Sequence, residues 1–447
     1  MNEIYRRGML CLLALGIYSG AFAQDSTTQK WSLEQCIQHS LDHNTDLKKQ
    51  NLAIEVADNN LETNKLSALP SLSAGINNTT SWGRTLGNEN TYVDRNSNST
   101  GFNVNANVRL YQGGALKNQT KAAKLDVAYQ KEMLEVNQSN LTIQVTQAYL
   151  NILVSQELLD LTKEQTAITR KQLEITRAKV EAGSIDKGPL LELEAQLANN
   201  ISEEVTNQNN FELATLRLAQ MLELEDPSVL QIQNPELATV RAQMQLNGAE
   251  MYYQSALTLR PEIKAANTMI ERGNASAKAA KGGLYPTISA GANYSNGYYH
   301  YSGTDNASFQ DQMKGNARQS VNVNLSIPIF NGKRAKNSYK NAKIQVMQSK
   351  IDMIKAEKQL RSDVTTALTQ AKGAQQKYQS ATVQVKTSKE SFDFSQEKFN
   401  EGAMDVYNYN QAKNSFIRAK SQKIQAKYEF IFKTKVLDFY IGKEIKL

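Results

Sequence analysis

Apolar and polar residues alternate one by one in segments that recur in the two halves of the chain. In the first half, an alternating segment is formed by Phe102, Val104, Ala106, Val108 and Leu110 with Asn103, Asn105, Asn107 and Arg109. In the second half, the matching segment consists of Val321, Val323, Leu325 and Ile327 with Asn322, Asn324 and Ser326. A period of two predicts β-strands with one apolar and one polar face. Together with the segments before them, these predict strands at about 71–80, 101–111, 287–299 and 319–330.

Two environments fit such strands. Alternation alone fits a sheet that is half-buried on a soluble core. A barrel wall with lipid outside and water inside is favoured by the length of about ten residues and by a polar face made almost purely of Asn. In such a wall, the lumen-facing residues would be Asn103, Asn105, Asn107, Asn322 and Asn324. The lipid-facing residues would be Phe102, Val104, Val108, Val321, Val323, Leu325 and Ile327.

Helical patterns follow the strands in both halves. Residues 115–182 contain neither Gly nor Pro, and 333–401 contain only Gly373. As one helix, each stretch would be about 100 Å long. A thin apolar stripe in the first stretch has coiled-coil spacing with Gln165 and Gln172 in its seam, and consists of Val154, Leu158, Leu161, Ile168 and Ile175. Return helices after Gly183 and Gly402 complete long hairpins at about 115–224 and 333–440.

The two halves are copies of one another. The segment 68–75 reappears as 284–291, and the hairpin glycine Gly183 has its counterpart at Gly402. A capping box of Ser32 and Gln35 begins an opening helix that runs toward Ser67, and its counterpart lies at about 256–283. We expect repeat 1 at 24–226, a connector at 227–255 and repeat 2 at 256–447.

The strands set a requirement for assembly. Strands in lipid must close into a barrel, because open edges would leave backbone groups without hydrogen bonds there. Four strands per chain cannot close, since the smallest such barrels have about eight. Three copies would supply twelve strands. We therefore expect a mainly α protein with a membrane β-barrel contribution, built from two repeats of helix, strand, strand, long helix and helix. It would form a trimeric 12-stranded barrel with a long α-helical tunnel.

The first residues are typical of a secretory signal peptide. Arg6 and Arg7 precede an apolar stretch, and a small-residue site ends at Ala23. We expect 1–23 to be removed before Gln24. Because Cys11 lies in that segment, Cys36 would be the one cysteine of the mature chain, and no intrachain disulfide could form.

Composition favours long, water-exposed helices over a compact globule. Hydrophobic residues make up 40% of the chain, and only 7 of its 447 residues are Pro. The net charge of +7 is interspersed, without a basic block, which argues against a nucleic-acid partner. The chain has no phosphate loop, nucleophile elbow or metalloprotease motif. We expect no enzyme activity and no cofactor.

In its order of motifs, the chain resembles the TolC-type outer-membrane factors over nearly the whole mature length. The motifs are 33–44 at the opening helix, 260–263 at its counterpart, 284–286 before a strand, 327–332 before the second long helix, and the two hairpin tips at 182–197 and 401–412. The resemblance implies a homotrimer in outer-membrane lipid with a tunnel across the periplasm and no catalysis. It implies the exit duct of a tripartite efflux or type I secretion system, with substrate passing passively from an inner-membrane pump of the RND or ABC type and a periplasmic adaptor.

By this resemblance, the hairpin tips would contact the adaptor and form the gate. The residues concerned are Gly183, Ser184, Asp186, Gly402, Ala403, Asp405, Asn408 and Gln411. Gly183 and Gly402 would take conformations that a β-carbon penalises. Some family members carry carboxylates where this chain has Asn408 and Gln411, so an acidic ring is not expected there. We expect Asp186, Glu192, Glu194 and Asp405 to be solvated or paired with Lys187 or Arg418 rather than to line the constriction.

Cys36, His39 and His43 share one face of the opening helix, and Cys/His sets of this kind bind zinc. No fourth ligand is evident, which favours a core thiol beside solvated imidazoles.

A rival interpretation comes from another class of protein. It is a periplasmic coiled-coil scaffold or adaptor, without a transmembrane barrel, whose short strands form a soluble domain. Osmotic shock would release such a protein, whereas a channel would need detergent.

Overall fold

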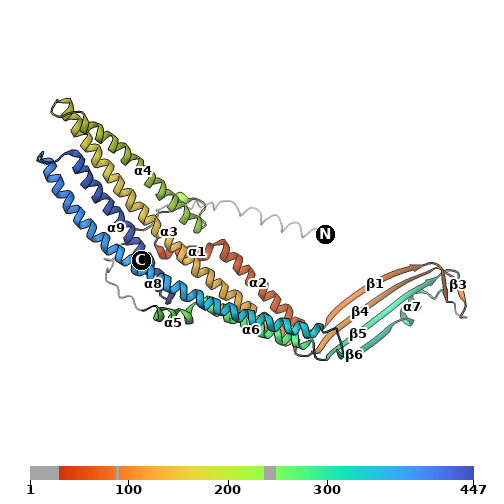
Figure 1. Cartoon of the computed structure of the whole chain (residues 1–447). Coiled ribbons are helices and arrows are strands. Elements are labelled where there is room, and N and C mark those ends of the chain that lie inside the picture. The colour runs from red at the N-terminus through yellow and green to blue at the C-terminus, as the bar shows by residue number, and fades with distance from the viewer. Residues whose placement is uncertain (1–29, 87–89, 236–247) are drawn as a thin grey trace, which may run out of the picture.

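The computed structural model describes residues 30–86, 90–235 and 248–447. The expected signal peptide and part of the expected connector lie outside the described residues. Two long helical hairpins lie side by side at one end of an elongated molecule, and a sheet projects from the other end (Figure 1). The helices are α1 (Leu33–His43), α2 (Thr45–Leu66), α3 (Ala115–Glu181), α4 (Gly188–Met221), α5 (Ala249–Leu259), α6 (Pro261–Gly282), α7 (Phe309–Gly315), α8 (Arg334–Asn400) and α9 (Val406–Tyr440), with a 3-10 turn at Pro227–Val229.

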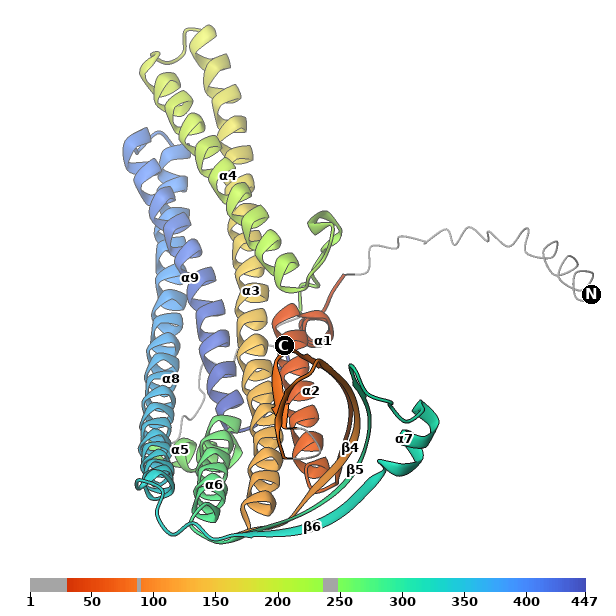
Figure 2. The same cartoon turned by 90° about the vertical axis from the view of Figure 1, so that its right-hand side faces the viewer.

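The strands form two antiparallel sheets within the described residues. They are β1 (Ser71–Ser81), β2 (Arg84–Leu86), β3 (Tyr92–Asp94), β4 (Ser97–Gln112), β5 (Thr287–Tyr301) and β6 (Arg318–Ser326). The main sheet has the order β1-β4-β5-β6, and β2 pairs with β3 in a small hairpin. Figure 2 shows the main sheet bent into an arc. Its first two strands come from repeat 1 and its last two from repeat 2, so the sheet joins the repeats.

The long helices follow the sequence pattern closely. Helices α3 and α8 are uninterrupted over 67 residues each, and α4 and α9 return beside them. Figure 1 shows the two hairpins ending at neighbouring tips. The seam expected on α3 is only partly buried, because Ile168 and Ile175 are exposed in the single chain. Gln165 of the same seam is buried and donates a hydrogen bond to Asn200 on α4.

The opening helices differ from the expectation of one continuous helix per repeat. The expected capping box is present, with Ser32 Oγ accepting from Gln35 N and Gln35 Oε1 accepting from Ser32 N. The helix then breaks at Asn44, whose side chain accepts hydrogen bonds from Asp46 N and Leu47 N and so caps α2. Asn favours such a cap over a helix interior. In repeat 2 the equivalent break comes at Arg260, because Pro261 suits the first position of a helix.

The ends of the strands also differ from their expected limits. Strand β6 stops at Ser326 rather than near 330, since Pro328 has no N–H for a ladder. Strands β4 and β5 extend further than expected, and the loops between strands contain the β2–β3 hairpin and the short helix α7.

Two apolar cores hold the middle of the molecule, where α1 and α5 pack on the long helices. The first contains Leu33, Cys36, Val145, Tyr149, Ile152, Leu218 and Tyr428. The second contains Tyr252, Ala256, Leu360, Val364 and Leu437. Tyr149 donates hydrogen bonds to the carbonyls of Trp31 and Gln233, which ties the segments around α1 to α3.

The protomer has two open sides. Near the sheet, neighbouring helices follow the order α2, α3, α6, α8, and near the tips the order is α4, α3, α9, α8. Helix α8 therefore forms one side along its whole length, and α2 and α4 form the other. The same arrangement continues in the sheet, where β1 and β6 are the edge strands. No helix in the described part of the chain is long and apolar enough to cross a membrane.

Candidate functional site

The register of the main sheet sorts its side chains onto two faces. Residues directly opposite each other on paired strands share a face. One row across the sheet is apolar and consists of Leu72, Ala106, Ala292 and Val321. The next row is polar and consists of Ser73, Asn105, Asn293 and Ser320. The alternation seen in single strands therefore extends across all four.

The apolar face is open to the surroundings of the chain. Val321 is 83% exposed, and Val104, Val323, Leu325 and Ile327 are exposed as well, Ile327 lying just past the end of β6. Phe102 and Val108 are half-buried. Figure 1 shows no long helix over either face of the sheet. Exposed apolar faces of this kind are typical of surfaces that contact a membrane or another protein.

The opposite face carries a network of amide side chains. Asn103, Asn105 and Asn107 lie on it from β4, and Asn322 and Asn324 from β6. Asn293 donates a side-chain hydrogen bond to Asn105. Gly291 lies between two of these amides, and a β-carbon there would be 2.8 Å from Asn322 Oδ1. The face is thus polar, and Arg109 and Arg318 add positive charge in the rows of Asn324 and Asn103.

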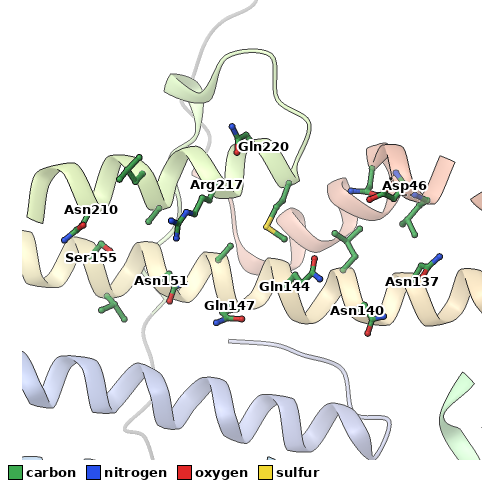
Figure 3. Close-up of a pocket in the computed structure, with 18 of the residues that line it drawn as sticks. Asp46, Asn137, Asn140, Gln144, Gln147, Asn151, Ser155, Asn210, Arg217 and Gln220 are labelled. Atoms are coloured by element: carbon green, nitrogen blue, oxygen red, sulfur yellow. Dashed lines mark hydrogen bonds between the residues drawn. The ribbon is translucent and has the colours of Figure 1, made fainter. Parts of the chain in front are cut away.

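A polar groove of about 1330 Å³ lies between α2, α3 and α4 (Figure 3). Its floor is a stripe of amides on α3 at 3–4 spacing, formed by Asn137, Asn140, Gln144, Gln147 and Asn151. Three charged side chains also line the groove, Arg217 on α4 and Asp46 and Lys49 on α2. The apolar core contacts of α3, at Val145, Tyr149 and Ile152, interleave with this stripe on another face of the helix. The groove is open to solvent rather than a closed ligand pocket.

Each hairpin tip is closed by a glycine in a left-handed conformation. Gly183 has φ +67° and Gly402 has φ +74°. At the first tip, Gly183 N bonds Val180 O and Ser184 N bonds Lys179 O. At the second, Gly402 N bonds Phe399 O and Ala403 N bonds Lys398 O. This is the Schellman helix ending, so the expected backbone role of both glycines is confirmed.

The acidic residues near the tips differ between the repeats. Asp405 caps α9 by accepting a hydrogen bond of 2.9 Å from Asn408 N, and a second from Asn408 Nδ2. These bonds lower the pKa of Asp405. Asp186 does not cap α4, which begins at Gly188 with Lys187 as an uncapped N-cap. Gln411 is exposed on α9.

The expected ion pairs with Lys187 or Arg418 do not form between described residues. Glu194 pairs instead with Arg177 at 3.0 Å, and Glu192 accepts a hydrogen bond from Asn410. Of the two expected alternatives, pairing with Lys187 or Arg418 is therefore wrong, whereas Asp186 and Asp405 are exposed to solvent as the other alternative expects.

A buried polar layer joins the two hairpins, and sequence reasoning missed it. Lys413 on α9 is 6% exposed and donates hydrogen bonds to Thr169 and Gln172 on α3, each at 3.2 Å. Gln172 in turn donates to the hydroxyl of Tyr409 on α9. Burial lowers the pKa of Lys413 to about 8. A signal was present, since Gln172 stands at a seam position where coiled coils favour apolar residues.

The Cys36, His39 and His43 set is not arranged as a metal site. Cys36 is fully buried in the first core, and burial raises the pKa of its thiol to about 12. The rings of His39 and His43 stack at 4.1 Å instead of converging on a point with the sulfur. Over the described residues, no group of three or more His, Cys, Asp or Glu side chains is placed to hold a metal ion.

The combination of long helical hairpins with a two-faced sheet is found in one class of outer-membrane channels, and solved structures of that class share the fold. The outer membrane channel CmeC of Campylobacter jejuni superimposes with a TM-score of 0.77 at 16% identity, covering 92% of this chain and 85% of that chain. Among curated relatives, the outer membrane efflux protein BepC of Brucella suis biovar 1 is 23% identical, with 74% of this chain and 68% of BepC covered. Outer membrane protein TolC of Escherichia coli strain K12 is 22% identical over 94% of this chain and 83% of TolC.

The sequence profile of the family described as "Outer membrane efflux protein" matches residues 36–223 and 252–442. The chain therefore belongs to the outer membrane efflux protein family. The expected fold class and resemblance are confirmed. The protein is an efflux channel of the outer membrane with a large periplasmic part, and not an enzyme.

Proposed function

We propose that three copies of the chain close into one tube that crosses the outer membrane and the periplasm. Edge strand β6 of one copy would pair with β1 of the next, and α8 would pack beside α2 and α4 of its neighbour. This proposal is supported by the order of the elements, which is the same in the helices and in the sheet. The open side at α2 and α4 is continuous with edge strand β1, and the open side at α8 is continuous with edge strand β6. Closure would satisfy the backbone groups that the edge strands leave unpaired in lipid.

The observation that carries the proposal is the two-faced sheet. Exposed residues such as Val321 and Val323 on one side, and amides such as Asn105 and Asn322 on the other, suit a wall between lipid and water. The amide face and the amide stripe on α3 would line a wet, polar path. Substrate would move along it by passive diffusion, because none of these groups supplies energy for transport.

The hairpin tips would be the docking and gating end. A periplasmic adaptor would contact the exposed tip residues Gly183, Ser184, Asp186, Gly402, Ala403, Asp405, Asn408 and Gln411, and an inner-membrane RND or ABC pump would deliver the substrate. The proposal is supported by their exposure at the end farthest from the sheet (Figure 1). The contacts of Lys413 between the hairpins would help to hold the resting state.

Negative-stain electron microscopy of the mature protein, extracted from outer membranes in detergent, tests the proposal. We expect hollow cylinders with three-fold symmetry about the long axis. Solid rods, or a protein that osmotic shock releases without detergent, would instead support the scaffold interpretation and overturn the channel.

A further inference from the structure

Basic residues that are scattered in the sequence gather at the junction between the sheet and the helices. Helices α2 and α6 end at this junction, and α3 and α8 begin there (Figure 1). Exposed cations on the helical turns nearest the sheet, which we call the cation belt, are Lys65, Lys117, Lys121, Lys124, Lys278, Lys281, Lys333, Arg334, Lys336, Lys340 and Lys343. In the ten helical residues nearest the sheet on each helix, all of them described, the carboxylates are Asp58 and Glu62, both on α2. The sequence has no basic block, but the fold brings these separated cations together at one level of the molecule.

The cation belt is not paired within the chain. None of its members forms an ion pair among the described residues, whereas Arg272, Lys377 and Lys427 further along the helices each pair with a carboxylate. Two members lie over aromatic rings instead, Lys281 over Tyr285 at 6.0 Å and Lys343 over Tyr339 at 5.0 Å. Unpaired cations that lie this close together repel one another. Anions from outside the chain would relieve this repulsion.

Helix stability explains only part of the belt, because Lys65 and Lys281 lie in the last turns of α2 and α6, where cations favour the helix dipole, whereas the belt residues of α3 and α8 do not have this advantage. Helices α3 and α8 begin at the junction, and neither has an acidic residue in its first turn. Cations at a helix N-terminus oppose the helix dipole. Lys333 also has a left-handed backbone with φ +62°, a conformation that repeat 1 reaches with Gly114. At the beginnings of α3 and α8, positive charge is therefore present although the helix dipole disfavours it.

An exposed apolar belt lies at the end of the sheet that is next to the cations. It includes Leu110, Tyr111, Leu284, Tyr285, Ile327, Ile329 and Phe330, of which Ile329 is 95% exposed. A register shift after Arg109 places Tyr111 opposite Ile288, on the apolar face of the sheet. From the sheet toward the helices, the surface is apolar, then partly aromatic, then cationic. A membrane presents hydrocarbon, interface and phosphate in the same order.

We propose that the cation belt binds the phosphate groups of anionic phospholipids at the periplasmic surface of the membrane. The inference rests on the proposed function, because it needs the sheet to lie in lipid. Lysine and arginine near a membrane surface attract anionic headgroups, and salt weakens the attraction. The belt would fix the depth of the tube, with the aromatic side chains at the interface and the ammonium groups among the phosphates.

Spin-labelled phosphatidylglycerol and phosphatidylcholine would test the inference, with the mature protein in vesicles of phosphatidylethanolamine and phosphatidylglycerol. Electron paramagnetic resonance measures the fraction of each lipid immobilised by the protein. The test variant carries Lys117→Gln, Lys336→Gln, Lys340→Gln and Lys343→Gln. The matched control carries Lys171→Gln, Lys179→Gln, Lys372→Gln and Lys386→Gln, four exposed lysines far from the sheet. We expect the preference for phosphatidylglycerol to fall by about fivefold or more in the test variant alone, and to fall with salt in the unchanged protein.

Other results would overturn the inference in distinguishable ways. If both variants insert and conduct while the lipid preference is unchanged, the belt does not bind lipid and the channel stands. If the preference is unchanged but the reversal potential in a salt gradient shifts in the test variant, the belt faces the lumen. If the unchanged protein does not enter vesicles at all, the proposed function fails and the inference fails with it.

Discussion

Lys413 on α9 and Gln172 on α3 are joined by a hydrogen bond of 3.2 Å between their side chains, although they lie in different repeats. The ammonium group has a second bond to Thr169 and no carboxylate partner among the described residues. A buried charge without a counter-ion is costly even when it is hydrogen-bonded. The contact therefore holds the hairpins in register at an energetic cost.

The free energy of unfolding should depend on pH, because the cost of burying the Lys413 ammonium group disappears when the group loses its proton. Burial lowers the pKa of Lys413 to about 8 in the folded protein, from an ordinary value of 10.5. Below pH 8 the residue is charged in both states and the destabilisation is complete. Between pH 8 and about 10.5 only the unfolded chain keeps the proton, so folding stability rises with pH by about 3 kcal/mol from this residue. Thermal unfolding in detergent across this range measures the slope.

A Lys413→Met variant isolates the contribution of Lys413 from those of other titrating groups. It should melt at a higher temperature than the unchanged protein below pH 8, because an apolar chain of similar length replaces the buried charge. The difference between the two proteins should shrink as pH rises. A difference in melting temperature that stays constant as pH rises would contradict the assignment of the lowered pKa to Lys413.

Substitution of Gly402 tests the tip geometry. Gly402→Ala should destabilise the second hairpin by about 1–2 kcal/mol, since a β-carbon is disfavoured at φ +74°. Gly373→Ala is the matched control, because Gly373 lies inside α8 with open space around it. That change should be neutral or stabilising. Amide hydrogen exchange around each substituted glycine measures both effects, and equal loss of protection in the two variants would disprove the argument.

Asp405 and Asp186 should differ in their effect on the resting conductance. Asp405→Ala removes the cap of α9 and should loosen its first turn, whereas Asp186→Ala removes no cap. Single-channel recording in planar bilayers should therefore show a larger change for Asp405→Ala. Asp405→Ser keeps a capping oxygen without the charge and should stay close to the unchanged protein. If Asp405→Ser and Asp405→Ala behave alike, charge rather than capping controls the gate.

Neighbouring residues on β6 give a paired test of the sheet faces. Val321→Arg places a charge on the exposed apolar face and should reduce stability in the membrane by about 2–4 kcal/mol if it lies near the midplane. Asn322→Arg should be tolerated and should instead alter ion selectivity. Urea unfolding in vesicles and reversal potentials measure the two effects. Equal tolerance of both substitutions would argue that neither face meets lipid.

Much of the architecture could be predicted because periodicity is a local property. The alternation around Asn105 and Asn322 was enough to predict two faces, and the glycines at 183 and 402 marked the ends of the hairpins. The family then supplied the assembly that such pieces require. These features survive in a single sequence because each depends on residues close together in the chain.

Other features depend on contacts between distant residues. The sequence around Lys413 reads as an ordinary exposed helix, and only the packing of α9 on α3 buries the ammonium group. The cation belt combines lysines from four helices that are up to 278 positions apart, such as Lys65 and Lys343. The break at Asn44 was missed for a different reason, because a capping residue inside an amphipathic pattern is a weak signal against a continuous helix.

The two open edges of the main sheet have a genetic consequence. If each tube is a ring of three subunits, every β6 edge depends on the β1 edge of another subunit, and no subunit can compensate for a damaged neighbour. A proline placed in the middle of β6 would remove a donor from the shared ladder. In a cell that makes both versions of the protein, mixed rings would outnumber intact ones, so such an allele would be dominant over the wild type. A null allele of the same gene would be recessive. If the proline allele is dominant and the null allele is recessive when each is expressed beside the wild type, the subunits share one barrel wall. If both alleles are recessive, the subunits act independently.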